Sequence, residues 1–511
     1  MASEAGVSVP PDSAVSRPGR SVVVIGGGLA GIAAAVRLAE AGRAVTLVET
    51  RQRLGGRATS FNDPATGDLL DNCQHVLLGC CTSLIDLYRR LGVLDLIEWH
   101  RRLWFRDAAG HVDVLEADDL PAPLHMTRAL MGFRSLGVRD KLAISRGMLA
   151  MMRVGREGRR RLGDLSFADW LVQHRQPQSA IDRFWAVIII SACNEQPHNV
   201  AARYALQVFQ DGFLNHEDSY VMGLAAVPLV KLYDPAAAVI ERAGGRVLLS
   251  SGAQRLVIEG DRVQALQLTD GAILHADDFV SAVPFDRLAK LLPAEAAGRD
   301  TRFRGLLQLT VSPIIGIHLF FDRPVMDRPH LILMDSPLQW IFNKAEGTGV
   351  RSQESGPRND GIPDTRHGST ELAEVPTPDP RSSPGQHLHG VISAAHELVD
   401  QPADAIAALT EREMRKALDI PADARVLHQR VVKEKRATFS VAPGSDRWRA
   451  SATGAIANLM LAGDWTDTGW PATMEGAVRS GYTAAAALLS DALTLPADLP
   501  DSPWFALLQG A

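Results

Sequence analysis

The chain has 511 residues, with 53 Lys and Arg against 59 Asp and Glu, so its formal net charge is −6. Its 46% hydrophobic and 22% charged residues exclude a wholly disordered or collagen-like chain, and its length predicts two or three domains. The mildly acidic balance argues against a general nucleic-acid binder. The four cysteines fit no metal-binding or disulfide spacing, so we expect reduced thiols, a cytoplasmic protein and no metal site.

The chain begins with a polar segment followed by a predicted βαβ unit. Residues 1–20 contain three prolines and no apolar core, which indicates a disordered tail and not a signal peptide. The continuous apolar run at residues 22–25 predicts a buried parallel strand. Residues 32–41 predict an alanine-rich helix, and residues 44–48 predict a second parallel strand. A parallel sheet is therefore expected at the start of the chain.

A glycine-rich loop joins the first predicted strand to the helix. It reads Gly26-Gly27-Gly28-Leu29-Ala30-Gly31, a GxGxxG pattern that allows a tight turn and brings a pyrophosphate close to the helix N-terminus. Glu49 follows at the end of the second strand, where a carboxylate accepts from a ribose hydroxyl and disfavours NADP. The residues predicted to bind a dinucleotide here are Gly26, Gly28, Leu29, Ala30, Gly31 and Glu49.

A second double-glycine loop follows within residues 53–59. Gly55, Gly56 and Ala58 permit close approach of the backbone, and Arg57 can pair with phosphate oxygens. A simple NAD site does not need this second loop, whereas a longer cofactor does. The two loops together predict FAD.

Later segments complete the predicted cofactor site. Strands are expected at residues 247–249, 254–258, 263–268, 279–283 and 459–462, with a helix starting near residue 475. Gly463 and Asp464 end the last of these strands, so Asp464 can accept from cofactor hydroxyls. Glu475, Gly476 and Ala477 would bring the positive end of a helix close to the flavin ring.

This pattern predicts an α/β protein with two interwoven domains. The first is a discontinuous Rossmann-like FAD-binding domain of the glutathione-reductase type, assigned to residues 21–85, 226–290 and 455–492. The second is an α+β substrate domain, assigned to residues 86–225 and 291–454. Residues 346–385 contain six prolines and no aromatic residue, which predicts a disordered insertion in a hairpin.

These motifs resemble those of the flavin-containing amine oxidase and phytoene desaturase superfamily. Residues 71–79 and 462–466 are similar to the hydroxysqualene dehydroxylases of hopanoid biosynthesis, although Cys73 stands where that pattern has glycine. The resemblance implies reductive dehydroxylation of hydroxysqualene, a long-chain triterpene, to squalene. Two alternatives stay open: an FAD-dependent desaturase of a C30 or C40 polyisoprenoid, and a non-catalytic isoprenoid-binding escort protein, which the intact glycine loops oppose. The sequence identifies neither the electron donor nor an oligomeric state.

Dehydroxylation requires a proton donor, for which the chain offers His75 and Glu195, with Asp71 as a third candidate catalytic residue. His75 follows the second glycine loop, and the pKa of an imidazole suits acid catalysis near neutral pH. Asp71 could orient His75 or bind the flavin. Glu195 interrupts an apolar run, and burial in an apolar cavity would raise its pKa.

A basic and apolar stretch at residues 125–161 predicts a docking surface. It contains ten basic residues and only two acidic ones, interleaved with leucine, methionine and phenylalanine. Amphipathic basic helices bind anionic membrane surfaces, and a triterpene substrate resides in the bilayer. We therefore expect peripheral membrane association, with a charged helical face on the substrate domain as the alternative.

Overall fold

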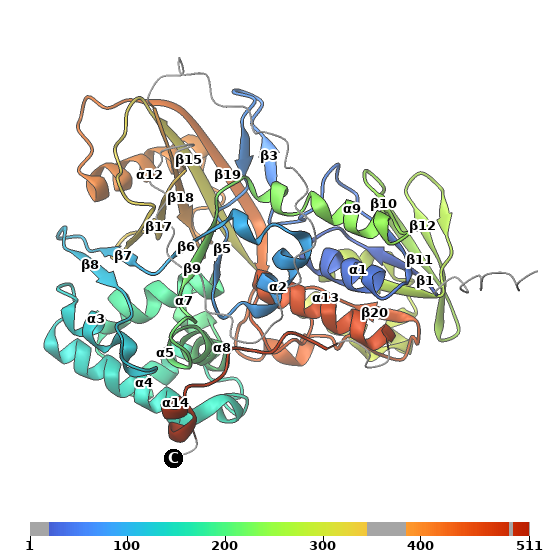
Figure 1. The fold of residues 1–511 in the computed structure, drawn as a ribbon, viewed down its shortest axis with the longest axis horizontal. Coiled ribbons are helices and arrows are strands. Elements are labelled where there is room, and N and C mark those ends of the chain that lie inside the picture. The colour runs from blue at the N-terminus through green and yellow to red at the C-terminus, as the bar shows by residue number, and fades with distance from the viewer. Residues whose placement is uncertain (1–19, 345–384, 490–493, 510–511) are drawn as a thin grey trace, which may run out of the picture.

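The computed structural model describes residues 20–344, 385–489 and 494–509 (Figure 1). Most of the predicted tail and most of the predicted insertion lie outside the described residues. A parallel sheet lies on the right of Figure 1, a large mixed sheet at the upper left and a group of helices at the lower left. In the described ranges, no helix combines the length and the apolar character needed to cross a membrane.

The parallel sheet has five strands that come from distant parts of the chain. Its order is β10 (Arg246–Leu248), β2 (Ala44–Val48), β1 (Ser21–Ile25), β14 (Asp278–Ser281) and β20 (Leu459–Leu461). Every neighbouring pair is parallel. The central strand β1 is an apolar run because both faces of the sheet are covered. The sheet confirms the predicted discontinuous Rossmann-like fold.

Helices cover one face of this sheet, and a small antiparallel sheet covers the other. The helices are α1 (Leu29–Glu40), α2 (Thr82–Leu91), α9 (Pro235–Arg242) and α13 (Met474–Leu489). The small sheet contains β11 (Ala253–Glu259), β12 (Arg262–Leu268) and β13 (Ile273–Leu274). Val22 and Val24 pack in the core with α1, whereas Val23 and Ile25 pack in the core with β11 and β12. This alternation follows from the two-residue period of a strand.

A seven-stranded mixed sheet forms the centre of the second domain. Its order is β19 (Val426–Phe439), β15 (Val311–Phe321), β18 (Gln386–Ile392), β17 (Trp340–Asn343), β16 (His330–Leu333), β7 (Leu103–Arg106) and β8 (Val112–Leu115). Only β7 and β16 pair in parallel. Helix α12 (Ala403–Leu418) packs on this sheet through Ile406 and Met414. Strands β17 and β18 are antiparallel neighbours, so the predicted insertion does connect two paired strands.

Two smaller sheets join the domains. One contains β5 (Val76–Leu78), β9 (Met222–Ala225) and β6 (Ile97–His100), and the other contains β3 (Ser60–Asn62) and β4 (Leu69–Asp71). The remaining helices are α3 (Thr127–Gly132), α4 (Val138–Arg159), α5 (Phe167–Gln173), α6 (Gln178–Ala180), α7 (Ala186–Cys193), α8 (Ala202–Phe209), α10 (Phe285–Leu291), α11 (Ala296–Arg299) and α14 (Pro503–Leu508). A short π-helical turn, η5 (Gln210–Leu214), extends α8.

The predicted domain boundary at residue 85 needs correction, because it falls inside α2. This helix continues until Gly92, whose φ of 70° ends it in a left-handed cap. Leu84, Leu87 and Leu91 pack in the same core as α1 and α13. The whole helix therefore belongs to the cofactor-binding layer.

Candidate functional site

The two glycine loops lie directly against each other. The amide of Gly55 donates to the carbonyl of Gly27 at 2.9 Å, and Gly56, with φ of 62°, approaches Gly28 so closely that a Cβ would stand 2.9 Å from its Cα. A Cβ on Gly31 would stand 1.8 Å from the carbonyl oxygen of Gly26. No side chain of the described residues caps the N-terminus of α1, which leaves its first amides available to an anion. The turn, the close approach and the open helix end are those that a pyrophosphate requires.

Glu49 does more than the sequence predicted. It is 6% exposed and accepts hydrogen bonds from two backbone amides, that of Gly27 at 2.7 Å and that of Arg51 at 2.8 Å. A carboxylate has further lone pairs for a ribose hydroxyl. Glu49 therefore stabilises the turn of the glycine loop in addition to the ribose contact that we predict.

Arg57 and Asp464 form an ion pair across the site, with 2.5 Å between Nη2 and Oδ1. Arg57 also donates to the carbonyl of Ala437 at 2.9 Å. Gly463, directly before Asp464, has a φ of 138°, and a Cβ there would stand 2.5 Å from the indole nitrogen of Trp465, so this position requires glycine. The structure thus brings together two predicted cofactor ligands that are 407 residues apart.

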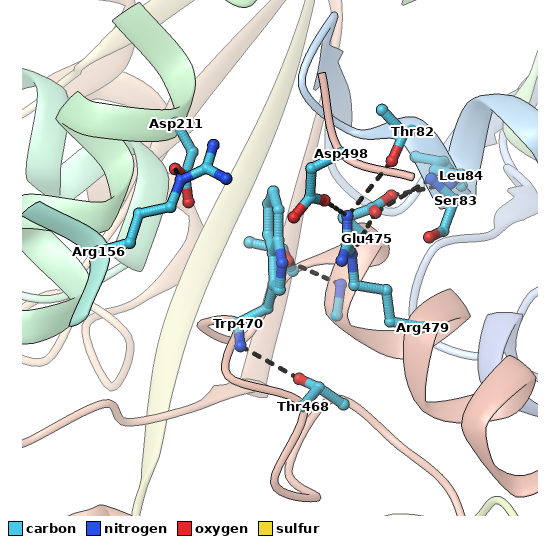
Figure 2. Close-up of polar contacts among 12 residues, drawn as sticks. Thr82, Ser83, Leu84, Arg156, Asp211, Thr468, Trp470, Glu475, Arg479 and Asp498 are labelled. Atoms are coloured by element: carbon cyan, nitrogen blue, oxygen red, sulfur yellow. Dashed lines mark hydrogen bonds and ion pairs between the residues drawn. The ribbon is translucent and has the colours of Figure 1, made fainter. Parts of the chain in front are cut away.

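Residues at the start of α13 make more contacts within the protein than the sequence predicted. Both oxygens of Glu475 accept from amides at the start of α2, those of Ser83 and Leu84, at 3.0 and 2.8 Å, and Arg479 pairs with it at 2.6 Å (Figure 2). Thr473 accepts from the amide of Gly476 through its hydroxyl at 3.0 Å. These contacts give Glu475 the role of tying α13 to α2, and its direct contact with the cofactor stays a prediction, as do those of Gly476 and Ala477.

The segment from Asp71 to His75 lies between the cofactor loops and the large sheet. Asp71 is buried, and its carboxylate accepts from Ser60 and from the amide of Leu229 and pairs with Lys344 at 3.2 Å. No hydrogen bond joins Asp71 to His75 among the described residues, although the Asp71 carboxylate acts electrostatically on the imidazole, so its roles in orienting His75 or binding the flavin stay predictions. Cys73 does not have a positive φ, so its backbone accommodates a side chain where the family pattern has glycine.

His75 donates from Nδ1 to the carbonyl of Cys73, 2.9 Å away. Since a carbonyl only accepts, Nδ1 carries the proton and Nε2 is left with a lone pair in the neutral ring. Burial lowers the pKa of His75 below its ordinary value. At neutral pH the imidazole is therefore neutral, so it holds no proton at Nε2 to donate, and it is a weaker base than an ordinary histidine.

Glu195 is 2% exposed, and its Oε2 lies 3.2 Å from Nε2 of the half-exposed His396. Its other oxygen has no hydrogen-bond partner among the described residues. Neither Glu195 nor His75 lines the cavity described below. The structure records no contact between the two residues.

Sequence reasoning missed a group of histidines beneath this segment. Nε2 of His318 contacts the carbonyl of Asp71, and its Nδ1 lies 2.9 Å from Nε2 of His387. The centre of the His389 ring lies 4.0 Å from that of the His318 ring. Burial lowers the pKa of His318 to about 4. His387 and His389 stand two positions apart in an apolar strand, so their side chains point to the same face of the sheet. This spacing is the sequence signal that could have revealed the group.

An apolar cavity adjoins this region and contains about 1110 Å³ of open space, its mouth included. Residues from α7, α8, β5, β7 and β17 form its walls. Val76 and Leu78 on one side and residues from Trp470 to Glu475 on another come from the two segments predicted to flank the flavin. The mainly apolar lining suits an apolar organic ligand.

The two interlocking glycine loops and Glu49 form a glycine cradle. This cradle and the fold define an FAD-dependent oxidoreductase. FAD fits the residues present, because the open end of α1, the two interlocking glycine loops and Glu49 provide for the pyrophosphate and the ribose. A profile of the family described as flavin containing amine oxidoreductase matches residues 29–489. The chain belongs to this family.

Curated relatives and solved structures support the assignment. The chain is 26% identical to the 15-cis-phytoene desaturase of Synechococcus elongatus, covering 92% of this chain and 96% of that protein. It is 25% identical to the zeta-carotene desaturase of a Synechocystis species, covering 92% and 97%. Putrescine oxidase bound to putrescine has the same fold, with a TM-score of 0.64, 16% identity and coverage of 92% and 99%. An oxidoreductase from Methanosarcina mazei has a TM-score of 0.65, 16% identity and coverage of 90% and 98%.

Proposed function

We propose that this protein is an FAD-dependent oxidoreductase that desaturates a long polyisoprenoid hydrocarbon of the C30 or C40 class. The observation that carries the proposal is the apolar cavity walled by the two segments next to the expected flavin. Bound FAD supplies hydride transfer. The chain's own residues then have to hold a long apolar molecule, exclude water and accept a proton.

The charges around the cavity favour a hydrocarbon over an amine. Two carboxylates occur among its lining residues, those of Asp211 and Glu475. Asp211 pairs with Arg156 and Arg159 at 3.2 and 2.9 Å, and Glu475 pairs with Arg479. An ammonium substrate would need a carboxylate that is not already neutralised.

The neutral form of His75 bears on the choice between desaturation and dehydroxylation. Removing two hydrogens from a carbon chain releases a proton, which requires a base. A neutral His75 is one group that can take up this proton, but it does not line the cavity, so the proton has to reach Nε2 through another group such as a water molecule. The curated relatives named above are also desaturases.

Reductive dehydroxylation of hydroxysqualene is the second candidate, because residues 71–79 resemble those of hydroxysqualene dehydroxylases. This reaction needs a proton donor at the departing hydroxyl. The lowered pKa of His75 opposes that role, so another group would have to donate. The escort-protein alternative is disfavoured by the complete cradle for FAD.

One anaerobic experiment distinguishes the two reactions. Oxidised protein is incubated with phytoene or squalene, and dithionite-reduced protein is incubated with hydroxysqualene, while flavin absorbance and products are followed. Bleaching of the flavin with a more unsaturated product supports desaturation. Reoxidation of the flavin with formation of squalene supports dehydroxylation. A flavin that responds to neither class contradicts the proposal.

Peripheral attachment to an anionic, cytoplasmic membrane face is part of this proposal. The supporting surface is smaller than residues 125–161, because Arg156 and Arg159 turn inward to Asp211. Exposed apolar side chains occur instead just before and within its N-terminal part; they are Leu120, Leu124, Met131, Val138 and Leu142. Exposed arginines lie among or just after them in sequence, at positions 128, 134, 139 and 146.

Vesicle flotation tests this surface. Val138 and Leu142 are 74% and 58% exposed, so replacing both by serine should reduce binding to phosphatidylserine-containing vesicles. The matched control replaces Leu307 and Leu427, which are 73% and 62% exposed elsewhere. Equal binding by both double variants would contradict a role for this surface.

A further inference from the structure

We propose that the C-terminal segment, residues 494–509, is a strap that holds one edge of the apolar cavity closed by positioning Arg479 and Arg156. The segment lies beyond residues 29–489, which match the family profile. The role of the strap rests on the proposed function in one respect, because the cavity is taken as the substrate site.

The first attachment runs through Arg479. Asp498 of the strap pairs with this arginine, which also pairs with Glu475 at 2.6 Å and stacks on Trp470, its guanidinium carbon 4.7 Å from the ring centroid. Trp470 and Glu475 both line the cavity. One carboxylate of the strap therefore fixes the cation that holds an aromatic wall residue.

The second attachment runs through Arg156. Asp501 of the strap pairs with this arginine at 2.8 Å, and the same guanidinium pairs with Asp211 at 3.2 Å. Asp211 lines the cavity from η5. Figure 2 shows Trp470 between the Arg156–Asp211 pair and the group around Arg479.

The end of the strap is anchored on the substrate domain. Ser502 donates from its amide to the carbonyl of Asn215 at 2.8 Å and from its hydroxyl to that of Ala122 at 2.7 Å. Phe505 is fully buried in the large core, and a Cβ on Gly155 of α4 would lie 3.5 Å from Gln509. The segment therefore passes from α13 to α4, as the red chain in Figure 1 shows.

Each of the two arginines is shared between a strap carboxylate and a cavity carboxylate. Opening the cavity at the edge between Trp470 and Asp211 would separate at least one of these carboxylates from the arginine with which it pairs. Because Asp498 is 46% exposed, its pair alone contributes little, so the two attachments have to be tested together. Asp498 and Asp501 are thus positioning residues, since they act through the arginines.

Cys81 provides a reporter that needs no substrate. It lines the cavity and is partly exposed, whereas Cys73 and Cys193 are buried with thiol pKa values raised to about 12. The FAD-loaded protein is treated with N-ethylmaleimide, and modification of each cysteine is timed by peptide mass spectrometry. The variants are the double substitution Asp498→Asn/Asp501→Asn and a chain ending at residue 489.

We expect Cys81 to react about fivefold faster or more in both variants, because the local opening that exposes it becomes more frequent. The conservative Asp498→Glu/Asp501→Glu variant should restore the slow rate. The matched control, Asp400→Asn/Asp423→Asn, removes two exposed carboxylates paired with Lys435 and Arg323 and should react like the wild type.

Two outcomes would overturn the strap: an unchanged rate at Cys81, or an equal acceleration at all four cysteines, which reports general loosening. If the shortened chain does not fold, the double substitution alone decides. Failure of the proposed reaction in the anaerobic assay would leave these labelling rates unaffected, so the two proposals fail separately.

Discussion

Glu49 accepts a hydrogen bond from the backbone amide of Gly27, with 2.7 Å between Oε2 and the nitrogen. The two residues lie 22 positions apart and join the end of β2 to the turn after β1. A Cβ on Gly27 would stand 3.0 Å from Cβ of Glu49, so the turn and the carboxylate fit each other. The acid at this position is therefore part of the cradle, in addition to being the predicted ligand for the ribose.

Replacing Glu49 by alanine should weaken FAD binding at least tenfold. The change removes a charge-assisted hydrogen bond of about 1.5–3 kcal/mol to the ribose and leaves the Gly27 amide without its acceptor. FAD titration by flavin fluorescence measures the loss. Glu241→Ala, an exposed glutamate on α9, serves as the control. Unchanged affinity in Glu49→Ala would remove this residue from the site.

The cradle was predictable because its signals are local. Apolar runs closed by glycines mark β1 and β2, and the spacing of Gly26, Gly28 and Gly31 marks the turn. The contacts of Glu475 with α2 join residues nearly 400 positions apart, and no local pattern announces such a pairing. The strap could not be predicted for the same reason, because no local pattern links Asp498 and Asp501 to Arg479 and Arg156.

The insertion between β17 and β18 should be dispensable. The amide of Lys344 donates to the carbonyl of His387 at 2.9 Å, so the two strands stay paired at its base. A Cβ on Gly385 would stand 2.7 Å from the carbonyl of Phe321, so the excision should end at residue 384. Replacing residues 346–384 by a short Gly/Ser turn should preserve flavin content and turnover, because loop closure depends weakly on length. A large loss of folded yield would contradict this prediction.

The protein should lose stability as the pH falls below about 6.5, the ordinary pKa of histidine in an unfolded chain. Burial lowers the pKa of His330 to about 3 and those of His125 and His318 to about 4. The unfolded chain then binds more protons than the folded one, so stability is complete above pH 6.5 and declines toward the folded pKa values. Each group contributes up to about 1.4 kcal/mol per pH unit in that window.

Urea titrations at pH 7.5, 6.0 and 5.0 measure this dependence. His330→Phe should flatten it, because it removes a fully buried imidazole. His275→Phe, at an exposed position, should leave the slope as in the wild type. An equal slope in all three proteins would show that His330 is not among the groups responsible.

His75→Ala should separate a catalytic base from a structural histidine. As the base, His75 receives the substrate's proton at Nε2 through an intervening group, since it does not line the cavity, and its loss should slow flavin reduction by a polyisoprenoid about 10²–10⁴-fold without releasing FAD. The wild-type rate should fall only at pH values below the ordinary histidine pKa, since burial lowers the pKa of His75 and the base must be neutral. Single-turnover absorbance of the flavin across pH measures both effects.

The same variant discriminates between the two reactions. An acid at the departing hydroxyl would have to be protonated, so dehydroxylation through His75 should be fastest at low pH and should fail in a pre-reduced His75→Ala protein given hydroxysqualene. A structural histidine would instead lose flavin or stability with little selective effect on chemistry. A rate within about threefold of the wild type in both assays removes His75 from the mechanism. Glu195 is then the next residue to replace, because one of its buried oxygens has no partner among the described residues.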